Sequence, residues 1–96
     1  DNMYINVDFV KFVEAFKKDG RDSQFSKTGL EVIYNELTQL EEETGHRIEL
    51  DVIALCCDWT ETTTENCFDD TGYTVDELEE YTTVLQKDDV IVYFNF

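Results

Sequence analysis

Apolar side chains recur every three or four positions along two stretches of the first half of the chain. The first stretch predicts a helix over residues 8–18, whose buried face is formed by Phe9, Phe12, Val13 and Phe16. The second predicts a helix that begins near Ser26 or Thr28, ends at Gly45 and buries Leu30, Ile33, Tyr34, Leu37 and Leu40. We therefore expect two amphipathic helices that share one core.

Alternating or continuous apolar residues predict the strands. Residues 3–7 alternate between apolar and polar positions, which is typical of a short strand. Residues 48–59 are apolar on both sides of the pleat in their middle, which predicts a central strand partly covered on both faces. Residues 82–86 and 90–96 are rich in β-formers and flank Lys87-Asp88-Asp89, so they predict a hairpin.

Polar turns and short helices are expected between the central strand and the hairpin. Residues 60–64 are polar and typical of a turn, and residues 65–71 predict a short helix that ends at Gly72. Thr74 and Glu77 have the spacing of a capping box, which predicts a further helix from Val75 to about Tyr81.

Length and element order together predict one small α+β domain over residues 1–96. We expect a three- to four-stranded mixed or antiparallel sheet with helices packed mainly on one face. Asp1 and Asn2 are expected to be an addition ahead of a native start at Met3. No apolar run reaches the ~20 residues that a membrane span needs, so no membrane is expected as a partner.

Acidic residues dominate the second half of the chain. Twenty-three acidic and seven basic residues give a net charge of −16, and the stretch from Glu49 to Glu80 holds eleven carboxylates and no lysine or arginine. This charge excludes ordinary nucleic-acid binding, which needs a basic surface, and disfavours an anionic membrane surface. Aromatic residues are interleaved with these acids, so we expect a folded negative face and not a disordered tail.

The cysteines do not form a metal-binding pattern. Cys56 and Cys57 are adjacent in the expected strand, so their side chains would point to opposite faces, and the inward one is expected to be a small buried core residue. His46 is the sole histidine, and a zinc site would need it to meet Cys67 and one of the paired cysteines without any zinc-ligand spacing. An odd cysteine count favours a reducing compartment, and we expect no metal or other cofactor.

Calcium binding and catalysis have little support in the sequence. The segment from Asp69 to Gly72 looks like part of a calcium loop, but aligning its glycine places Cys67 and Leu78 at the first and last ligand positions. No serine or cysteine motif accompanies His46, and there is no glycine-rich phosphate loop. We therefore expect a protein that is not an enzyme.

The acidic surface is the remaining candidate for function. Carboxylates three or four positions apart on a helix lie about 5–6 Å from each other at Cβ, close to the separation of successive phosphates along a nucleic-acid strand. A rigid band of them fits a basic groove that normally holds nucleic acid. The expected contact residues are Asp58, Glu61, Glu65, Asp69, Asp70, Asp76, Glu77, Glu79 and Glu80. The competing interpretation is a solvated face that only keeps the protein soluble.

Several segments of the chain resemble one group of proteins. The most specific is Leu50-Asp51-Val52-Ile53-Ala54-Leu55-Cys56-Cys57-Asp58-Trp59, and others are Phe25-Ser26, Leu30-Glu31, Glu41-Glu42-Glu43-Thr44-Gly45 and Thr82-Thr83-Val84. In these segments the chain resembles a family of small acidic hypothetical proteins of phages, prophages and bacterial plasmids. The resemblance implies a counter-defence role, such as an anti-CRISPR or anti-restriction protein that mimics nucleic acid.

This resemblance and the charge together define the expected partner. We expect a basic surface of a host nucleic-acid-binding protein or complex, reached in the cytoplasm of a bacterial host. The protein is expected to be a monomer, or a homodimer paired through the C-terminal strand that ends at Phe96. The alternative is a small structural or regulatory phage protein whose acidity serves only solubility, and a metal-binding or redox module is a third and weaker possibility.

Overall fold

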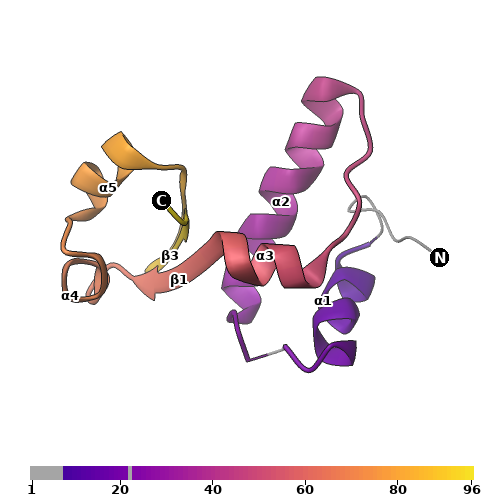
Figure 1. Ribbon diagram of the computed structural model, residues 1–96, viewed down its shortest axis with the longest axis horizontal. Helices are drawn as coiled ribbons and strands as arrows, with labels where there is room; N and C mark the ends of the chain where they lie inside the picture. The colour runs from indigo at the N-terminus through magenta and orange to yellow at the C-terminus, as the bar shows by residue number, and fades with distance from the viewer. Residues whose placement is uncertain (1–7, 22) are drawn as a thin grey trace.

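Five helices and a three-stranded antiparallel sheet make up the part of the chain that the computed structural model describes, residues 8–21 and 23–96 (Figure 1). The elements are α1 (Phe9–Lys18), α2 (Lys27–Thr44), α3 (Val52–Asp58), β1 (Trp59–Thr63), α4 (Cys67–Thr71), α5 (Val75–Tyr81), β2 (Val84–Lys87) and β3 (Val90–Phe94). The predicted α+β fold is confirmed. The strand predicted over residues 3–7 lies outside the described residues.

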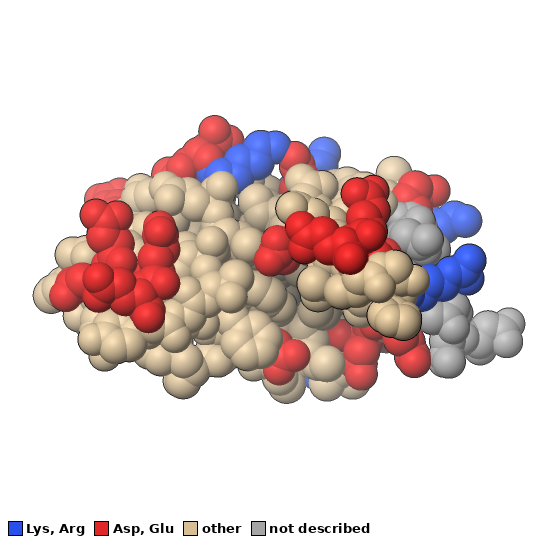
Figure 2. Space-filling view, turned by 90° about the horizontal axis from the view of Figure 1, so that it is seen from above, with Lys and Arg blue, Asp and Glu red and all other residues tan. Residues whose placement is uncertain are grey.

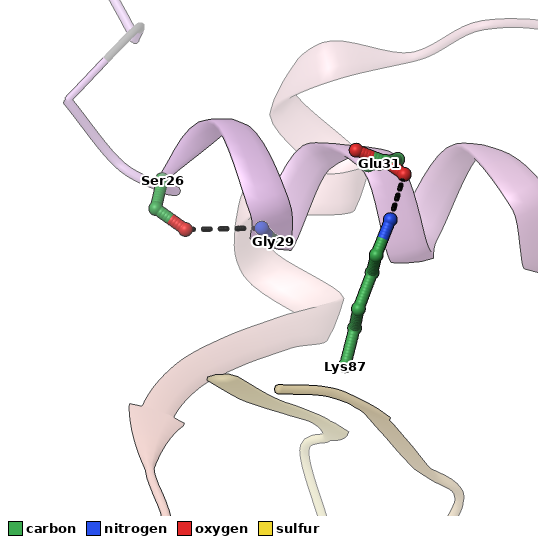
Figure 3. Close-up of polar contacts among 4 residues, drawn as sticks. All are labelled: Ser26, Gly29, Glu31 and Lys87. Carbon is green, nitrogen blue, oxygen red and sulfur yellow. Dashed lines mark hydrogen bonds and ion pairs between the residues drawn. The ribbon is translucent and has the colours of Figure 1, made fainter. Parts of the chain in front are cut away.

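The two long helices form where the apolar spacing predicts them, and side-chain caps fix where they begin. Asp8 accepts a hydrogen bond from the Lys11 N–H at 2.9 Å at the start of α1. Ser26 accepts one from the Gly29 N–H at 3.0 Å at the start of α2 (Figure 3). Gly45 ends α2 in the left-handed conformation that favours glycine, with φ of 71°.

The predicted hairpin is also confirmed and supplies two of the three strands. β2 and β3 pair antiparallel, and β3 lies in the centre of the sheet between β1 and β2. Ile91 and Val92 of β3 are each fully buried although they are adjacent and therefore point to opposite faces. Both faces of the central strand must therefore be covered.

The predicted central strand over residues 48–59 is wrong. Val52–Asp58 is helix α3, in which Asp51 caps the Ala54 N–H at 3.0 Å. Val52 and Leu55 are buried three positions apart while Ile53 is 55% exposed, which is a helical pattern. A short apolar run does not distinguish a strand from a buried helix, and here the cap favours the helix.

The strand lies one step further along the chain, over residues that were predicted to be a turn. Trp59–Thr63 form β1, which pairs with β3 so that Trp59 faces Phe94 and Thr63 faces Val90. Threonine is polar but β-branched, and its branched side chain packs well on a pleated surface. The run of threonines therefore extends along the sheet.

Helices cover both faces of the sheet, with the longer ones on one side (Figure 1). Val92 belongs to the main core with Phe12 and Phe16 of α1 and the apolar face of α2. The opposite face, which carries Ile91, is covered by the short helices α4 and α5, each of which buries one residue, Cys67 and Leu78 respectively.

The cysteines differ from the prediction because α3 is a helix. Cys57 is exposed and Cys56 is half-buried, so neither is the expected fully buried core residue. Burial raises the pKa of the Cys56 thiol, and the nearby Arg21 guanidinium lowers it to a smaller extent. The buried cysteine is Cys67, whose Sγ donates to the Tyr73 carbonyl at 3.5 Å.

Thiol labelling of the native protein checks this placement. Cys57 should react fastest, Cys56 more slowly because its raised pKa lowers its thiolate fraction, and Cys67 at least about tenfold more slowly than Cys57 because labelling needs local opening. The measurement is residue-resolved labelling by mass spectrometry. In denaturant all three should react at similar rates, and fast native labelling of Cys67 would contradict the position of α4.

Candidate acidic interface

Seven of the nine predicted contact residues gather at one end of the molecule. They lie on α4, on α5 and in the turn before α4, and all are exposed: Glu65, Asp69, Asp70, Asp76, Glu77, Glu79 and Glu80. We call these seven residues the acidic patch. Figure 2 shows one group of carboxylates at the left, where α4 and α5 lie, and other carboxylates toward the centre and right, while the visible lysines and arginines lie at the top and right.

The acidic side chains are exposed because α4 and α5 each bury only one residue. Each helix points one side chain fully into the protein, so most of its remaining surface faces solvent. Asp76 and Glu77 lie in the first turn of α5, where the helix dipole favours negative charge. Glu79 and Glu80 lie near its last turn, where negative charge is disfavoured and no basic residue relieves it. Stability alone does not account for these last two carboxylates.

Two carboxylates of the acidic patch fix the position of the helices that carry it. Asp70 accepts a hydrogen bond from the Thr62 hydroxyl at 2.5 Å, which ties α4 to β1. Glu77 accepts the Thr74 N–H at 3.0 Å while Thr74 accepts the Glu77 N–H at 3.2 Å, so the predicted capping box is confirmed. These carboxylates belong to the fold as well as to the surface.

The side chains of the other five members make no hydrogen bond or ion pair among residues 8–21 and 23–96: Glu65, Asp69, Asp76, Glu79 and Glu80. The nearest base along the chain, Lys87, is directed elsewhere. Lys87 pairs with Glu31 of α2 (Figure 3), and this hydrogen bond and charge raise the pKa of the Lys87 ammonium. The patch therefore presents carboxylates that this part of the chain does not neutralise.

Glu61 lies apart from the acidic patch and has a structural role. It is half-buried on the side of β1 that faces α2, and its Oε1 accepts the Ser26 N–H at 3.0 Å. A Cβ atom on Gly29 would overlap the same Oε1, so the glycine lets the carboxylate approach the first turn of α2. The positive end of the helix dipole favours a carboxylate there. Glu61 is therefore used within the fold.

Asp58 also lies outside the acidic patch. It is the last residue of α3, and its backbone carbonyl accepts the Asn95 N–H at 2.7 Å. Its side chain is exposed beside a shallow hollow of about 310 Å³ that Leu40 and Phe94 also line. Seven of the predicted contact residues therefore lie at one end of the molecule, and the sequence did not indicate the separate positions of Asp58 and Glu61.

One buried carboxylate was not anticipated. Glu41 of α2 is only 8% exposed, and its Oε2 accepts the Ile48 N–H at 2.6 Å, which holds the loop after α2 against the helix. Its Oε1 is buried without a hydrogen-bond partner among the described residues. Glu41 lies four positions after Leu37 on the buried face of α2, so helical spacing distinguishes it from the exposed Glu42 and Glu43 although all three stand in one acidic run.

The described structure gives little support to a metal site, a site around His46 or a membrane-spanning helix. Within residues 8–21 and 23–96, no three histidine, cysteine, aspartate or glutamate side chains are placed to hold a metal ion. His46 is exposed in the loop after α2. None of the described helices is both long and apolar enough to cross a membrane.

No family model, curated protein or solved structure matches this chain. The resemblance to phage and plasmid proteins therefore stays a prediction, and the function has to be argued from the surface.

The role of Glu61 can be tested through Gly29. Glycine to alanine within a helix normally stabilises by up to about 1 kcal/mol, but here Gly29→Ala should destabilise by about 1–2 kcal/mol because it displaces the Glu61 carboxylate from the Ser26 N–H. In a Glu61→Ala background the same substitution should be neutral or stabilising. Urea unfolding of the four proteins measures both values, and an equal cost in both backgrounds would rule out this contact.

Proposed function

We propose that this protein is a non-enzymatic inhibitor that uses the acidic patch to occupy a basic nucleic-acid-binding surface on a bacterial defence complex, as an anti-CRISPR or anti-restriction protein would. The proposal rests chiefly on one observation. Five exposed carboxylates lie at one end of the molecule without a partner in the described structure, and no lysine or arginine occurs between residues 48 and 86.

The rigidity of the acidic patch supports this proposal. Asp70 ties α4 to the sheet and the capping box fixes the start of α5, so the other carboxylates stand on positioned elements. Asp76 precedes Glu79 and Glu80 by three and four positions, which brings their Cβ atoms to about 5–6 Å. Fixed charges at this spacing need little reorganisation to replace phosphates in a basic groove.

The extent of the charge favours a local surrogate for nucleic acid. Residues 48–96 carry a net charge of −12 from thirteen acids and one base, whereas residues 1–47 carry −4 from ten acids and six bases. The acidic patch holds seven of these thirteen acids, so this end of the molecule would enter the groove while residues 1–47 stay outside it. Such a protein acts within the bacterial cytoplasm, where the defence complexes lie, and needs no cofactor.

Charge reversal tests the proposal. The variant Glu65→Lys, Glu79→Lys, Glu80→Lys changes three unpaired members of the acidic patch, and Lys11→Glu, Lys17→Glu, Lys18→Glu on α1 is the matched control. Affinity for the partner retained from a bacterial lysate should fall at least about tenfold for the first set and little for the control. The thermal midpoint of the first set should be unchanged or higher, because repulsion among the acids decreases.

Salt provides a second readout of the same complex. Raising the salt concentration from about 50 to about 500 mM should weaken binding by orders of magnitude if carboxylates replace phosphates. Affinity that stays flat with salt, or equal losses from both charge-reversal sets, would contradict the proposal and favour a face that only confers solubility.

A further inference from the structure

Four aromatic rings form a surface cluster next to the acidic patch. Tyr73 lies 5.0 Å from Tyr81 and 6.1 Å from Phe96 between ring centroids, and Tyr93 lies 6.5 Å from Phe96. The rings of Tyr81 and Phe96 are nearly parallel at 6.2 Å. We call Tyr73, Tyr81, Tyr93 and Phe96 the aromatic platform.

Two rings of the aromatic platform are exposed, while Tyr73 and Tyr93 are half-buried beside them. Tyr81 is 59% exposed and Phe96 is 67% exposed, so both bury little of their rings against the fold. The Thr82 hydroxyl donates to the Phe94 carbonyl at 2.6 Å, and the Phe94 N–H donates to Thr83 at 3.0 Å. These bonds tie the end of α5 to β3 and hold the rings in register. Since the fully buried Leu78 and Ile91 already supply the core on this side, folding does not explain the exposed rings.

Negative charge borders these rings. Tyr81 lies on the same face of α5 as Glu77, four positions earlier, whereas Glu79 and Glu80 precede it directly in sequence and project from other faces of the helix. A cation is therefore favoured beside these rings, and the face of an aromatic ring favours a guanidinium over an ammonium. A guanidinium is planar, so it stacks on an aromatic ring while its N–H groups pair with carboxylates. The ammonium of lysine is a strongly hydrated point charge that cannot do both in this way.

We propose that the aromatic platform binds arginine side chains of the basic partner, with the bordering carboxylates pairing with the same guanidinium groups. This inference rests on the proposed function and adds that arginine, more than lysine, is what the surface recognises. Charge argues against two other occupants. A second copy of this chain would bring two acidic patches together at a net charge of −16 each. A nucleic-acid base could stack on the rings, but its phosphates would be repelled.

Two capped peptides of equal length and charge test the inference, one of alternating arginine and glycine and one of alternating lysine and glycine. Calorimetric titration of the native protein should give about fivefold or more tighter binding of the arginine peptide. In Tyr81→Leu, Phe96→Leu this preference should fall to nearly one while affinity for the lysine peptide is kept, because the carboxylates are unchanged. Val10→Ser, at a 65% exposed position on α1, is the control and should keep the preference.

The outcomes separate this inference from the proposed function. Equal affinity of the native protein for both peptides, or an equal loss of both in the ring variant, would overturn the inference alone. If Glu65→Lys, Glu79→Lys, Glu80→Lys bound both peptides as well as the native protein, the proposed function would fail. Sedimentation of a dimer that the ring variant abolishes, or ring-dependent binding of a single-stranded oligonucleotide, would also overturn the inference. Thermal midpoints confirm that each variant is folded.

Discussion

Covering both faces of the central strand is the requirement on which the rest of the structure depends. Ile91 and Val92 are adjacent on β3, point to opposite sides and are each fully buried. The long helices α1 and α2 supply a core on the Val92 side. The Ile91 side is closed by α4 and α5, which are short, bury one residue each and expose the remainder. The acidic end of the molecule is thus the outer surface of a necessary layer.

Carboxylates in this protein divide into those that the fold uses and those that it only displays. Glu61 accepts the Ser26 N–H at the start of α2, Asp70 accepts the Thr62 hydroxyl and so links α4 to β1, and Glu77 completes a capping box. Glu79 and Glu80 have no such contact in the described structure and lie near a helix end that disfavours negative charge. Carboxylates that make no such contact within the described fold are free to contact a partner. The difference between these two groups of carboxylates supports the proposed function.

Local signals made much of the fold predictable, and long-range contacts limited the rest. The two long helices, the capping box at Thr74 and the hairpin are encoded by signals within a few residues, and each prediction is confirmed. Residues 48–59 were misassigned because a short apolar run fits a strand or a helix equally well. The patch was predictable since its members are neighbours in sequence, whereas Glu61 meets Ser26 across 35 positions. The aromatic platform joins Tyr81 of α5, Tyr93 of β3, Tyr73 from the bend between α4 and α5, and Phe96 after β3, so only the fold brings it together.

The proposed function requires that the acidic patch occupies the site where the partner binds nucleic acid. The most direct test is whether the captured partner can bind this protein and its nucleic acid at the same time. The nucleic acid that the partner binds is labelled, and its release is followed by fluorescence anisotropy as the protein is titrated in. Mutually exclusive binding is expected, with full release of the nucleic acid by the native protein and none by Glu65→Lys, Glu79→Lys, Glu80→Lys. A stable complex that contains partner, protein and nucleic acid together would contradict occupation of the nucleic-acid site.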